Sequence, residues 1–416
     1  MTAPLWTSLP ADWRTGQMKN AATVTLGKML QSSASENDVS APYMRAANVQ
    51  PDGALALHDV KRMWFDSAEL ERLSIRGGDV VVVEGGQGGF GRAAYVRKDL
   101  AGWGFQNSIC RLRPKRDVDG RFLGYYLIAL RASGFIHAYA NVVSMPHLTV
   151  DKLERVPIPL PPAEVQRAIA DYLDRETARI DTLIEEQQRL IEVLRERRRA
   201  VIELSIDFID ADRVALRHVA RLVSGSGFPV DEQGRTGEEL PFFKVKDLQS
   251  ANLSGRLVLA SDTISRETAR TLRATVIPGG SLTFAKVGAA LMLGRVGALP
   301  VDGCIDNNMS ALILDPAVDP EFARYLMLTF DFARFVQPGA VPSLNMEGVR
   351  EFRIPRISRE HQRRIVTYLD EQTMKINRLI SETERFIELS RERRVALITA
   401  AVTGQIDVRT AAQKAS

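Results

Sequence analysis

The chain contains one long helical segment twice. The first copy begins at Ile158 and reads IPLPPAEVQRAIADYLDRETARIDTLIEEQQRLIEVLRERRRAVI. The second copy begins at Ile354 and reads IPRISREHQRRIVTYLDEQTMKINRLISETERFIELSRERRVALI, so matching positions lie 196 residues apart without a gap. An internal repeat has to be recognised before a fold is assigned, because it decides how many similar units the chain holds. A variable block precedes each copy, which predicts two heads carried on a common helical frame.

The composition narrows the class of protein. The 416 residues are enough for about two to four domains with their own cores. A net charge of +4 permits nucleic acid as a partner without requiring it. Cys110 and Cys304 are the only cysteines, too few for a disulfide framework or a thiolate metal site, which favours a cytoplasmic location. No secretion signal and no membrane-spanning apolar run is visible.

Four blocks follow one another along the chain. They are a first head (residues 1–156), a first stalk (157–208), a second head (209–353) and a second stalk with a C-terminal tail (354–416). The first stalk opens on a cluster of residues that a helix tolerates only in its first turn, namely Pro157, Pro159, Pro161 and Pro162. The helix of the second stalk is expected to open at Ser358, a good N-cap, and to end near Gly404, a plausible C-cap.

Both stalks have the heptad spacing of coiled-coil helices. The expected seam consists of Leu173, Ile180, Ile184, Ile191, Leu194 and Val201 in the first stalk and Leu369, Ile376, Ile380, Ile387 and Leu397 in the second. About 40 residues at 1.5 Å each give a rod of roughly 60 Å. Polar residues interrupt the seams at Gln187, Arg198, Thr383, Ser390 and Arg394. They are either tolerated defects near a solvated end or features that fix the alignment of the two helices.

The two heads also repeat each other, more weakly than the stalks do. Five segments match in order: Tyr43–Val49 with Phe242–Leu248, Gly78–Val81 with Gly280–Thr283, Gly91-Arg92 with Gly294-Arg295, Gln106–Ser108 with Asn307–Met309, and Pro146–Leu148 with Pro342–Leu344. Apolar runs such as Val80–Val83 read as strands between glycine-rich turns. Two domains with one fold but different surfaces are expected if each domain recognises a different target.

A glycine-rich segment follows the Val80–Val83 run. Residues 86–91, GQGGFG, match the G-x-G-x-x-G pattern of dinucleotide-binding loops. That chemistry requires a helix whose N-terminus faces the pyrophosphate, and residues 92–103 show no helical stripe. The equivalent segment of the second head, residues 288–294, lacks the pattern. A plain loop between strands and a loop that touches a DNA backbone both remain open, since small residues let main-chain N–H groups approach phosphates.

No catalytic or metal-binding constellation is visible. The five histidines lack the spacing of metal ligands, and no nucleophile elbow, P-loop or H-E-x-x-H motif occurs. The Asp-Pro-Pro-Tyr and Asn-Pro-Pro-Tyr tetrapeptides of adenine methyltransferases are also missing. We therefore expect a non-enzymatic protein with no metal site.

Basic and aromatic residues are interleaved in both heads. Arginine, asparagine and glutamine suit bidentate contacts to base edges and lysine suits phosphates, the alternative for each being an ordinary solvated charge. The wider set is Arg45, Lys61, Arg62, Trp64, Arg92, Lys98, Arg113, Lys244, Lys246, Arg256, Arg273, Lys286 and Arg295. The candidate DNA-binding residues are Arg45, Asn48, Gly88, Arg92, Asn107, Lys244, Lys246, Lys286, Arg295 and Asn307.

Both stalks keep the same basic cluster, at Arg195–Arg199 and Arg391–Arg394. One interpretation is a solvated helix face, with Glu196 and Glu392 as partial ion-pair partners. The other is a docking surface for a partner protein. Its candidate residues are Tyr172, Leu173, Arg195, Arg198, Tyr368, Leu369, Arg391 and Arg394.

The order head, stalk, head, stalk resembles the specificity subunit of type I restriction–modification systems. The resemblance covers nearly the whole chain and is most specific where the stalks open. The matching segments are Ile158–Pro162 with Glu164 and Gln166, Ile169–Asp174, Ile354-Pro355, Glu360–Gln362, Ile365–Asp370, Leu397–Val408, and Gly78–Val81 with Gly91-Arg92. The second head has Ser281 where the first has Asp79, which argues against a functional role for Asp79.

The resemblance implies an α+β fold. Two repeated α/β target recognition domains would be separated by two long antiparallel coiled-coil helices with pseudo-two-fold symmetry. Each head would read one half of a split site in double-stranded DNA, and the stalks would set the gap and dock two methyltransferase subunits. Restriction subunits would join for cleavage. The chain itself would bind no cofactor, and S-adenosylmethionine, ATP and Mg would be held by the partner subunits.

Two other classes of function stay open. The chain could be a coiled-coil structural adaptor whose two similar heads bind proteins, or an enzyme that uses residues 86–91 to bind a nucleotide. Steep loss of DNA affinity with rising salt favours the DNA-recognition subunit over both.

Overall fold

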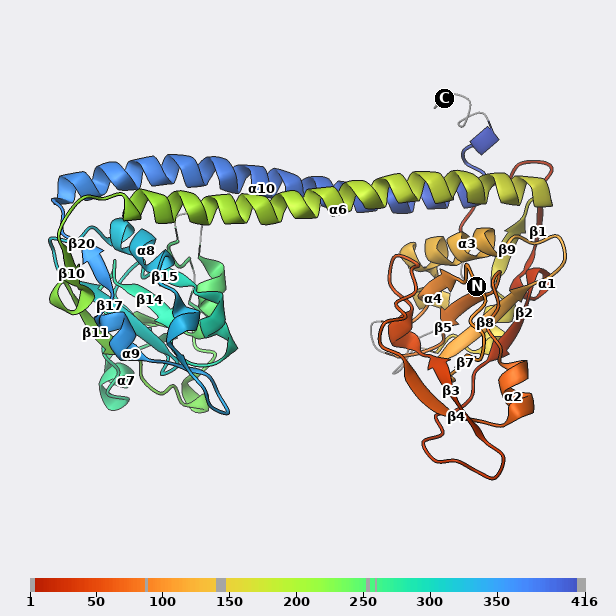
Figure 1. The fold of residues 1–416 in the computed structure, drawn as a ribbon, viewed down its shortest axis with the longest axis horizontal. Helices are drawn as coiled ribbons and strands as arrows, with labels where there is room; N and C mark the ends of the chain where they lie inside the picture. Colours follow the sequence, from red (N-terminus) through yellow and green to blue (C-terminus); the bar gives the residue numbers. More distant parts are fainter. Residues whose placement is uncertain (1–3, 87–88, 140–146, 252–254, 259, 410–416) are drawn as a thin grey trace. The chain divides into compact units, whose positions relative to one another are not determined.

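The computed structural model describes residues 4–86, 89–139, 147–251, 255–258 and 260–409, which form two compact units (Figure 1). Unit 1 comprises the described residues up to Glu186 and those from Phe386 on, and unit 2 comprises those from Gln187 to Arg385. Each unit holds one head and one part of each of two long helices. Gly88, a candidate DNA-binding residue, lies outside the described residues.

A four-stranded antiparallel sheet forms the centre of the first head. Its strands, in spatial order, are β2 (Ala22–Leu26), β8 (Ile109–Pro114), β5 (Val80–Val83) and β6 (Ala93–Tyr95). All four valines of β5 are buried because both faces of the sheet are covered. Val80 and Val82 belong to the core under helix α3 (Gly120–Ala132), while Val81 and Val83 belong to the core on the opposite face. This alternation follows from the two-residue period of a strand.

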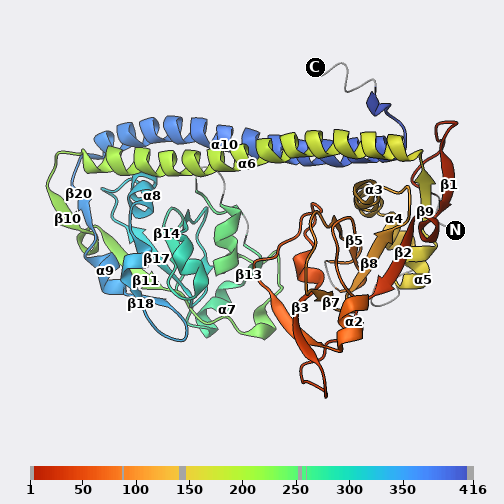
Figure 2. The same cartoon turned by 45° about the vertical axis from the view of Figure 1, so that its right-hand side comes forward.

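A three-stranded sheet covers that opposite face. It consists of β4 (Lys61–Phe65), β3 (Val39–Met44) and β7 (Gly104–Phe105), with β3 and β7 parallel. Figure 2 shows α3 between the four-stranded sheet and the long helices of unit 1. The remaining elements of this head are β1 (Arg14–Gln17), which pairs with β9 (Pro157–Leu160), α1 (Met18–Ala21), η1 (Ala46–Asn48), α2 (Ser67–Arg72), α4 (Phe135–Tyr139) and α5 (Val150–Glu154).

The second head repeats both sheets in the same order. The four-stranded sheet is β11 (Ala220–Ser224), β17 (Met309–Leu314), β14 (Leu282–Ala285) and β15 (Val296–Ala298), under helix α8 (Pro320–Leu328). The three-stranded sheet is β13 (Asp262–Ile264), β12 (Leu240–Phe243) and β16 (Cys304–Ile305). The other elements are β10 (Arg213–Ala215), which pairs with β20 (Arg353–Pro355), η2 (Leu216–His218), η3 (Val230–Glu232), η4 (Val245–Ser250), α7 (Arg266–Thr271), η5 (Ala289–Leu293), η6 (Phe332–Phe335), β18 (Val336–Gln337), β19 (Ser343–Leu344) and α9 (Met346–Arg350).

The shared topology confirms that the heads have one fold, but one of the five sequence matches is wrong by one residue. The N–H of Glu84 donates to the Ser108 carbonyl as the N–H of Lys286 donates to the Asn308 carbonyl, both at 2.8 Å. Ser108 therefore corresponds to Asn308 and not to Met309. The spacing from the preceding match does not carry over, because the connection from β6 to β7 is longer than that from β15 to β16.

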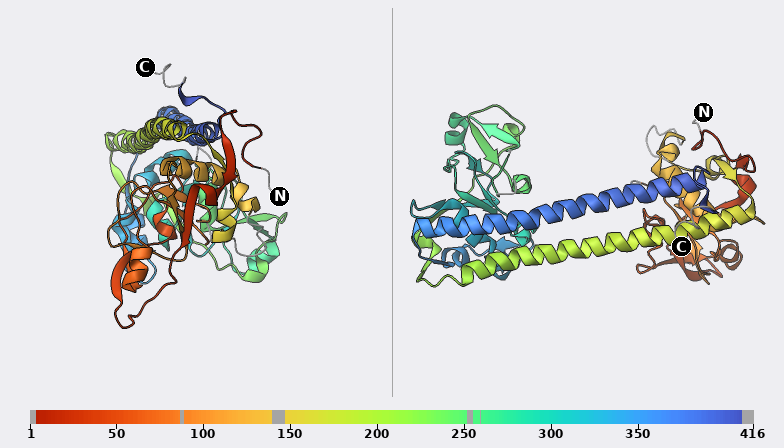
Figure 3. Two further views of the ribbon diagram at one scale, coloured as in Figure 1. Left: turned by 90° about the vertical axis from the view of Figure 1, so that its right-hand side faces the viewer. Right: turned by 90° about the horizontal axis from the view of Figure 1, so that it is seen from above.

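Two long helices, α6 (Ala163–Asp207) and α10 (Arg359–Val402), pack side by side within each unit (Figure 3). Asp181 of α6 forms an ion pair with Arg394 in unit 1, and Arg195 of α6 forms one with Glu384 in unit 2. The position on α10 falls as the position on α6 rises, so the helices are antiparallel.

The heptad seam is confirmed. The buried seam residues are Leu173, Ile180, Ile184, Ile191, Leu194, Leu369, Ile376, Ile380 and Ile387, while Val201 and Leu397 are partly buried. Of the polar interruptions, Arg394 and Arg198 reach across to the other helix, the latter through a bond from its guanidinium to Asn377 Oδ1 at 2.9 Å. These two contacts favour the interpretation that such residues fix the alignment.

The predicted ends of the stalk helices are right at two points and wrong at one. Ser358 caps α10, with its Oγ accepting the N–H of His361 at 3.3 Å. Gly404, with φ of +71°, follows the last turn of α10. The proline cluster does not open α6, because Pro157–Leu160 forms strand β9 and the helix begins at Ala163. In the described part of the chain, no helix is long and apolar enough to cross a membrane.

Candidate nucleic-acid interface and head–helix junctions

Each head carries a glycine-containing loop directly after its central buried strand. Gly86 after β5 has φ of +109°, and its equivalent Gly288 after β14 has φ of +85°. A Cβ at either position would meet no atom within 4 Å, so crowding does not require glycine here. The left-handed backbone conformation does. In unit 1 the chain continues into β6, which pairs antiparallel with β5. A strand therefore stands where a dinucleotide site requires a helix.

The residue that opens this loop has opposite charge in the two heads. The carbonyl of Glu84 accepts the N–H of Leu148 at 2.7 Å, and the carbonyl of Lys286 accepts the N–H of Leu344 at 2.8 Å, so the backbone frame is the same. The Glu84 carboxylate meets His147 Nδ1 at 2.8 Å. Sequence reasoning selected Lys286 and missed Glu84 and His147. An alignment of the loop glycines would have placed the acid and the lysine at one position.

The Lys286 side chain is half-buried at the end of β14. Its pKa is lowered because burial disfavours the ammonium, an effect that the nearby Asp306 carboxylate partly offsets. Asn307, in the turn before β17, is exposed, and its equivalent Asn107 is partly exposed in the first head. A cation at a strand end with an amide turn nearby combines the two side-chain types that read guanine and adenine edges.

Three candidates in the first head serve its own fold. Asn48 is 2% exposed, and its Oδ1 accepts the N–H of Arg45 at 2.9 Å while its Nδ2 donates to the Ala56 carbonyl at 2.8 Å. The Arg45 guanidinium pairs with Asp59, and this hydrogen bond lowers the pKa of that carboxyl. Arg92 is half-buried and donates to the Val49 carbonyl at 3.4 Å. These contacts hold one turn together, so we do not propose Asn48 as a base contact.

Apart from Lys286, the candidates in the second head divide into one residue in an internal ion pair and three exposed side chains. Lys244, the equivalent of Arg45, lies 2.8 Å from Asp262 and 4.9 Å from the ring centroid of Phe228. Its charge is therefore neutralised inside the head. Lys246, Arg295 and Asn307 are exposed.

Arg113, a member of the wider basic set, is the ion-pair partner that keeps Asp79 buried. Its Nε and Nη2 each donate to the buried Asp79 carboxylate at 2.8 Å, and Asp79 also accepts the N–H of Arg76 at 2.8 Å. The hydrogen bond with Asp79 raises the pKa of Arg113. Ser281 and Ile313 occupy the two equivalent positions in the second head. Asp79 is therefore a structural residue of one head.

A glutamine joins each long helix to its head. Gln166 of α6 accepts the N–H of Asp119 at 3.0 Å, and Gln362 of α10 accepts the N–H of Asp319 at 2.7 Å. Each aspartate also caps the helix that lies under the long helices, α3 or α8. Both glutamine side chains are buried, so losing one leaves an unsatisfied backbone group at the joint.

A tyrosine makes a second, equivalent joint. The Tyr125 hydroxyl donates to Asp174 Oδ1 at 2.8 Å and lies 3.3 Å from Thr177 Oγ1, both on α6. The Tyr325 hydroxyl donates to Asp370 Oδ1 at 2.6 Å on α10. Burial raises the pKa of Tyr125 to about 12 and also raises that of Tyr325. Both tyrosine hydroxyls therefore stay protonated at neutral pH and can donate their hydrogen bonds.

The candidate partner-binding residues of the stalks divide by burial. Leu173 and Leu369 are both 0% exposed and pack into the cores of their heads, so neither presents a surface to a partner. Arg394 is mostly buried in its pair with Asp181. The remaining candidates are partly or fully exposed, namely Tyr172, Arg195, Arg198, Tyr368 and Arg391.

A stripe of exposed apolar side chains runs along each long helix, and sequence reasoning missed it. Its members repeat at the 196-residue spacing: Leu183 with Leu379, Leu190 with Phe386, and Val193 with Leu389. On a helix, residues seven and ten positions apart share a face, so each set forms one stripe. The stripe could have been predicted from the sequence, because the heptads carry a second apolar position beside the buried seam. Among the described residues, no cluster of side chains could hold a metal ion.

Comparison with known proteins gives these features a context. Residues 10–194 match the family model described as the type I restriction modification DNA specificity domain. A solved structure from work on complex assembly and conformational transition of the type I R-M system has a TM-score of 0.75 at 17% identity, covering 96% of this chain and 100% of that one. The crystal structure of the HsdS subunit from Thermoanaerobacter tengcongensis has a TM-score of 0.53 at 18% identity, covering 96% and 98%. No curated protein matches the chain.

Proposed function

We propose that the chain is a specificity subunit of a type I restriction–modification system, a non-catalytic component, and that each of its heads reads one half of a bipartite site in double-stranded DNA. The observation that carries this proposal is the strand end after β5 and β14. One backbone frame presents Glu84 in the first head and Lys286 in the second. A glutamate accepts from the cytosine amino group, whereas a lysine donates to guanine, so the same frame suits different bases.

We propose the four-part division into a first head (1–156), a first stalk (157–208), a second head (209–353) and a second stalk with its tail (354–416). In this division the stalks set the unread gap between the half-sites. The buried seam and the duplicated glutamine and tyrosine joints support this role, because they fix each head to a long helix.

The exposed stripes on α6 and α10 are the proposed docking surfaces for methyltransferase subunits. Two equivalent stripes suit two copies of one partner, and exposed leucine and phenylalanine flanked by arginine are typical of interfaces. S-adenosylmethionine would then be bound by those subunits. ATP and Mg would be bound by restriction subunits where these are present.

The experiment that tests the proposal is genome-wide mapping of adenine methylation in the host, with the gene intact and deleted. A split motif that disappears on deletion supports sequence-specific recognition and reveals both half-sites. Unchanged methylation, together with purified chain that captures proteins but no DNA, would instead support a structural adaptor.

A further inference from the structure

The head–helix junction of unit 2 encloses a cavity of about 680 Å³ that the proposed function does not use. It lies among α6, α8, α10 and the loop before β15, all within residues 187–385. Cavities of this size are typical of sites for small ligands. Five arginines line it, from three different elements: Arg195, Arg198, Arg199, Arg295 and Arg324.

The positive charge of this cavity is compensated only in part. Among the described residues that line it, Asp331 is the single carboxylate. Arg195 and Arg199 have exposed carboxylate partners, which neutralise weakly in water. Arg324 is buried and forms an ion pair with Glu321 at 2.9 Å, so its charge is neutralised. Arg198 bonds to the neutral amide of Asn377 at 2.9 Å. The pKa of Arg198 is lowered by burial and by Arg195; Tyr325 opposes this shift, and Arg324 adds a smaller lowering effect.

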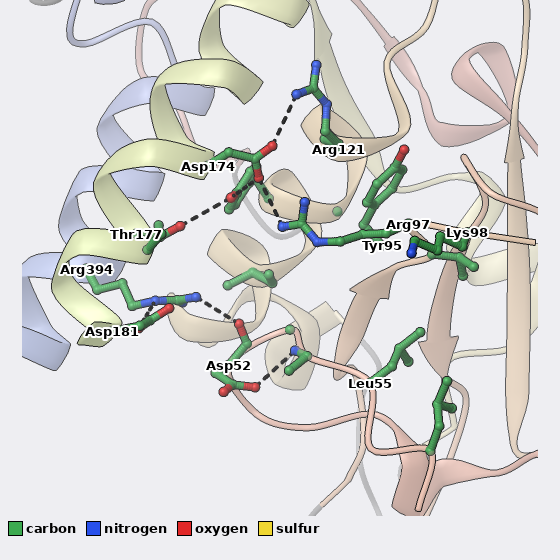
Figure 4. Close-up of a pocket in the computed structure, with 18 of the residues that line it drawn as sticks. Asp52, Leu55, Tyr95, Arg97, Lys98, Arg121, Asp174, Thr177, Asp181 and Arg394 are labelled. Atoms are coloured by element: carbon green, nitrogen blue, oxygen red, sulfur yellow. Dashed lines mark hydrogen bonds and ion pairs between the residues drawn. The ribbon is translucent and has the colours of Figure 1, made fainter. Parts of the chain in front are cut away.

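The equivalent junction of unit 1 is neutralised. Its cavity of about 530 Å³ is lined by four cations and three carboxylates: Arg97, Lys98, Arg121, Arg394, Asp52, Asp174 and Asp181. Figure 4 shows Arg121 bonded to Asp174 and Arg394 paired with Asp181. Arg394 Nε lies 2.9 Å from Asp181 Oδ1.

The repeat makes the two junctions directly comparable. Arg394 and Arg198 occupy equivalent positions 196 residues apart, and so do Asp181 and Asn377. One carboxylate in unit 1 is thus an amide of nearly the same shape in unit 2. This exchange removes the counter-charge of the Arg198 guanidinium while the surrounding helices stay the same. An anion in the cavity would supply a charged partner for Arg198 and Arg295.

We propose that the cavity of unit 2 binds a phosphate-bearing ligand. Guanidinium groups match phosphate oxygens with paired N–H donors, and several arginines around one space suit a group with several negative charges. Exposed Met292 and Leu293 provide an apolar side to the same cavity. The phosphate can belong to a free nucleotide or polyphosphate, or to a DNA backbone. The inference goes beyond reading by the heads and does not depend on it.

The test is calorimetric titration of the full chain with sodium tripolyphosphate and, separately, with ATP. Asn377→Asp restores the carboxylate that unit 1 already carries, so it is compatible with the fold. We expect it to weaken tripolyphosphate binding about tenfold or more, because it pairs Arg198 internally. Arg198→Gln should weaken binding to a similar extent. Asp181→Asn, the mirror change in unit 1, is the matched control and should leave the affinity of the unit 2 cavity unchanged.

A DNA arm distinguishes the source of the phosphate. If free phosphates do not bind, the salt dependence of binding to a duplex of random sequence is compared between the wild type and Asn377→Asp. A slope of log affinity against log salt that is smaller by about one in the variant assigns the cavity to a backbone phosphate. Wild type that binds neither tripolyphosphate nor ATP, with an unchanged DNA slope in the variant, overturns the proposal. Adenine methylation in the host is measured separately, so failure here leaves the reading function untouched.

Discussion

At the scale of single residues, the heads differ where their backbones agree. The bonds around Glu84 and Lys286 match within 0.1 Å, yet the side chains have opposite charge. Asp79 and Ser281 also differ, but there the acid is buried against Arg113 and serves one fold. A difference between the heads therefore points to recognition only where the side chain reaches the surface of the loop.

Replacing Lys286 with alanine should relax recognition at one base pair of one half-site. A good bidentate base contact contributes about 1–3 kcal/mol of discrimination, so the preference at that position should fall by about tenfold or more. Competition binding with duplexes mutated one position at a time measures it. Lys375→Ala, an exposed lysine on α10, is the control and should change no position. Unchanged preference at every position in K286A would rule out Lys286 as a reader.

The two cysteines should make the chain less stable in alkali. Burial, with a contribution from Glu84, raises the pKa of Cys110 to about 12, and burial raises that of Cys304 to about 11. In the unfolded chain a thiol titrates near pH 8.5. Because the folded pKa values are raised, the stabilisation is complete below about pH 8.5 and is lost as the pH rises toward the folded values. Each thiol should lower the free energy of unfolding by about 2 kcal/mol between pH 8 and 10.

Urea unfolding at pH 8, 9 and 10 checks this expectation. A variant with both cysteines replaced by alanine should show a flatter dependence in this window, below the range where the buried tyrosines titrate. A wild-type free energy of unfolding that stays constant from pH 8 to 10 would contradict it.

Residue roles could be predicted from the sequence only in part. Arg45, Asn48 and Lys244 are of the right type for DNA, but each bonds to neighbours that the sequence does not reveal as neighbours. Glu84 was missed because the sequence match between the heads was followed only from Gly78 to Val81, three residues short of it.

At the scale of elements, the long helices and the apolar strand Val80–Val83 could be predicted from the sequence, whereas strand β9 could not. A heptad seam repeats locally, so Leu173, Ile180 and their equivalents could be placed from spacing alone. Strand β9 was read as the start of a helix because its partner, β1, lies about 140 residues earlier in the chain. Proline spacing gives no sign of so distant a partner. The exposed stripe was overlooked because a buried seam already accounted for the leucines.

The two kinds of helix leucine should respond differently to substitution. Leu369→Ala removes a fully buried side chain from the core of the second head and should cost about 2–5 kcal/mol of folding free energy. Leu379→Ala, on the same helix but about half exposed, should change stability by less than about 0.5 kcal/mol. The same L379A variant should bind methyltransferase subunits more weakly, as measured by pull-down or titration. Equal destabilisation by both variants, or full partner binding by L379A, would count against the proposed stripe.

At the scale of the whole molecule, the chain is built from two copies of the same parts. The chain repeats its stalks at a fixed spacing of 28 heptads, its heads in topology, and its joints in residue type. What differs between the copies is charge, at the strand ends and in the junction cavities. The sequence alone predicted the repeated frame, because heptads and motifs are local. The differing charges could not be interpreted from the sequence, because only the structure shows which of them lie at a strand end or line a cavity.

Inserting seven residues into each stalk should lengthen the unread gap and leave both half-sites unchanged. One heptad keeps the seam in register and adds about 10 Å of helix, or roughly three base pairs. Mapping of adenine methylation in cells that carry the variant gives the gap directly. An unchanged gap, or an altered half-site, would contradict the role of the stalks as a spacer.

The most direct test of the central claim replaces the second head, residues 209–353, with the equivalent head of another specificity subunit and maps adenine methylation genome-wide. The account predicts a split motif in which one half-site is replaced and the other is retained unchanged. A motif in which both halves change, or neither does, would show that the two heads are not independent readers.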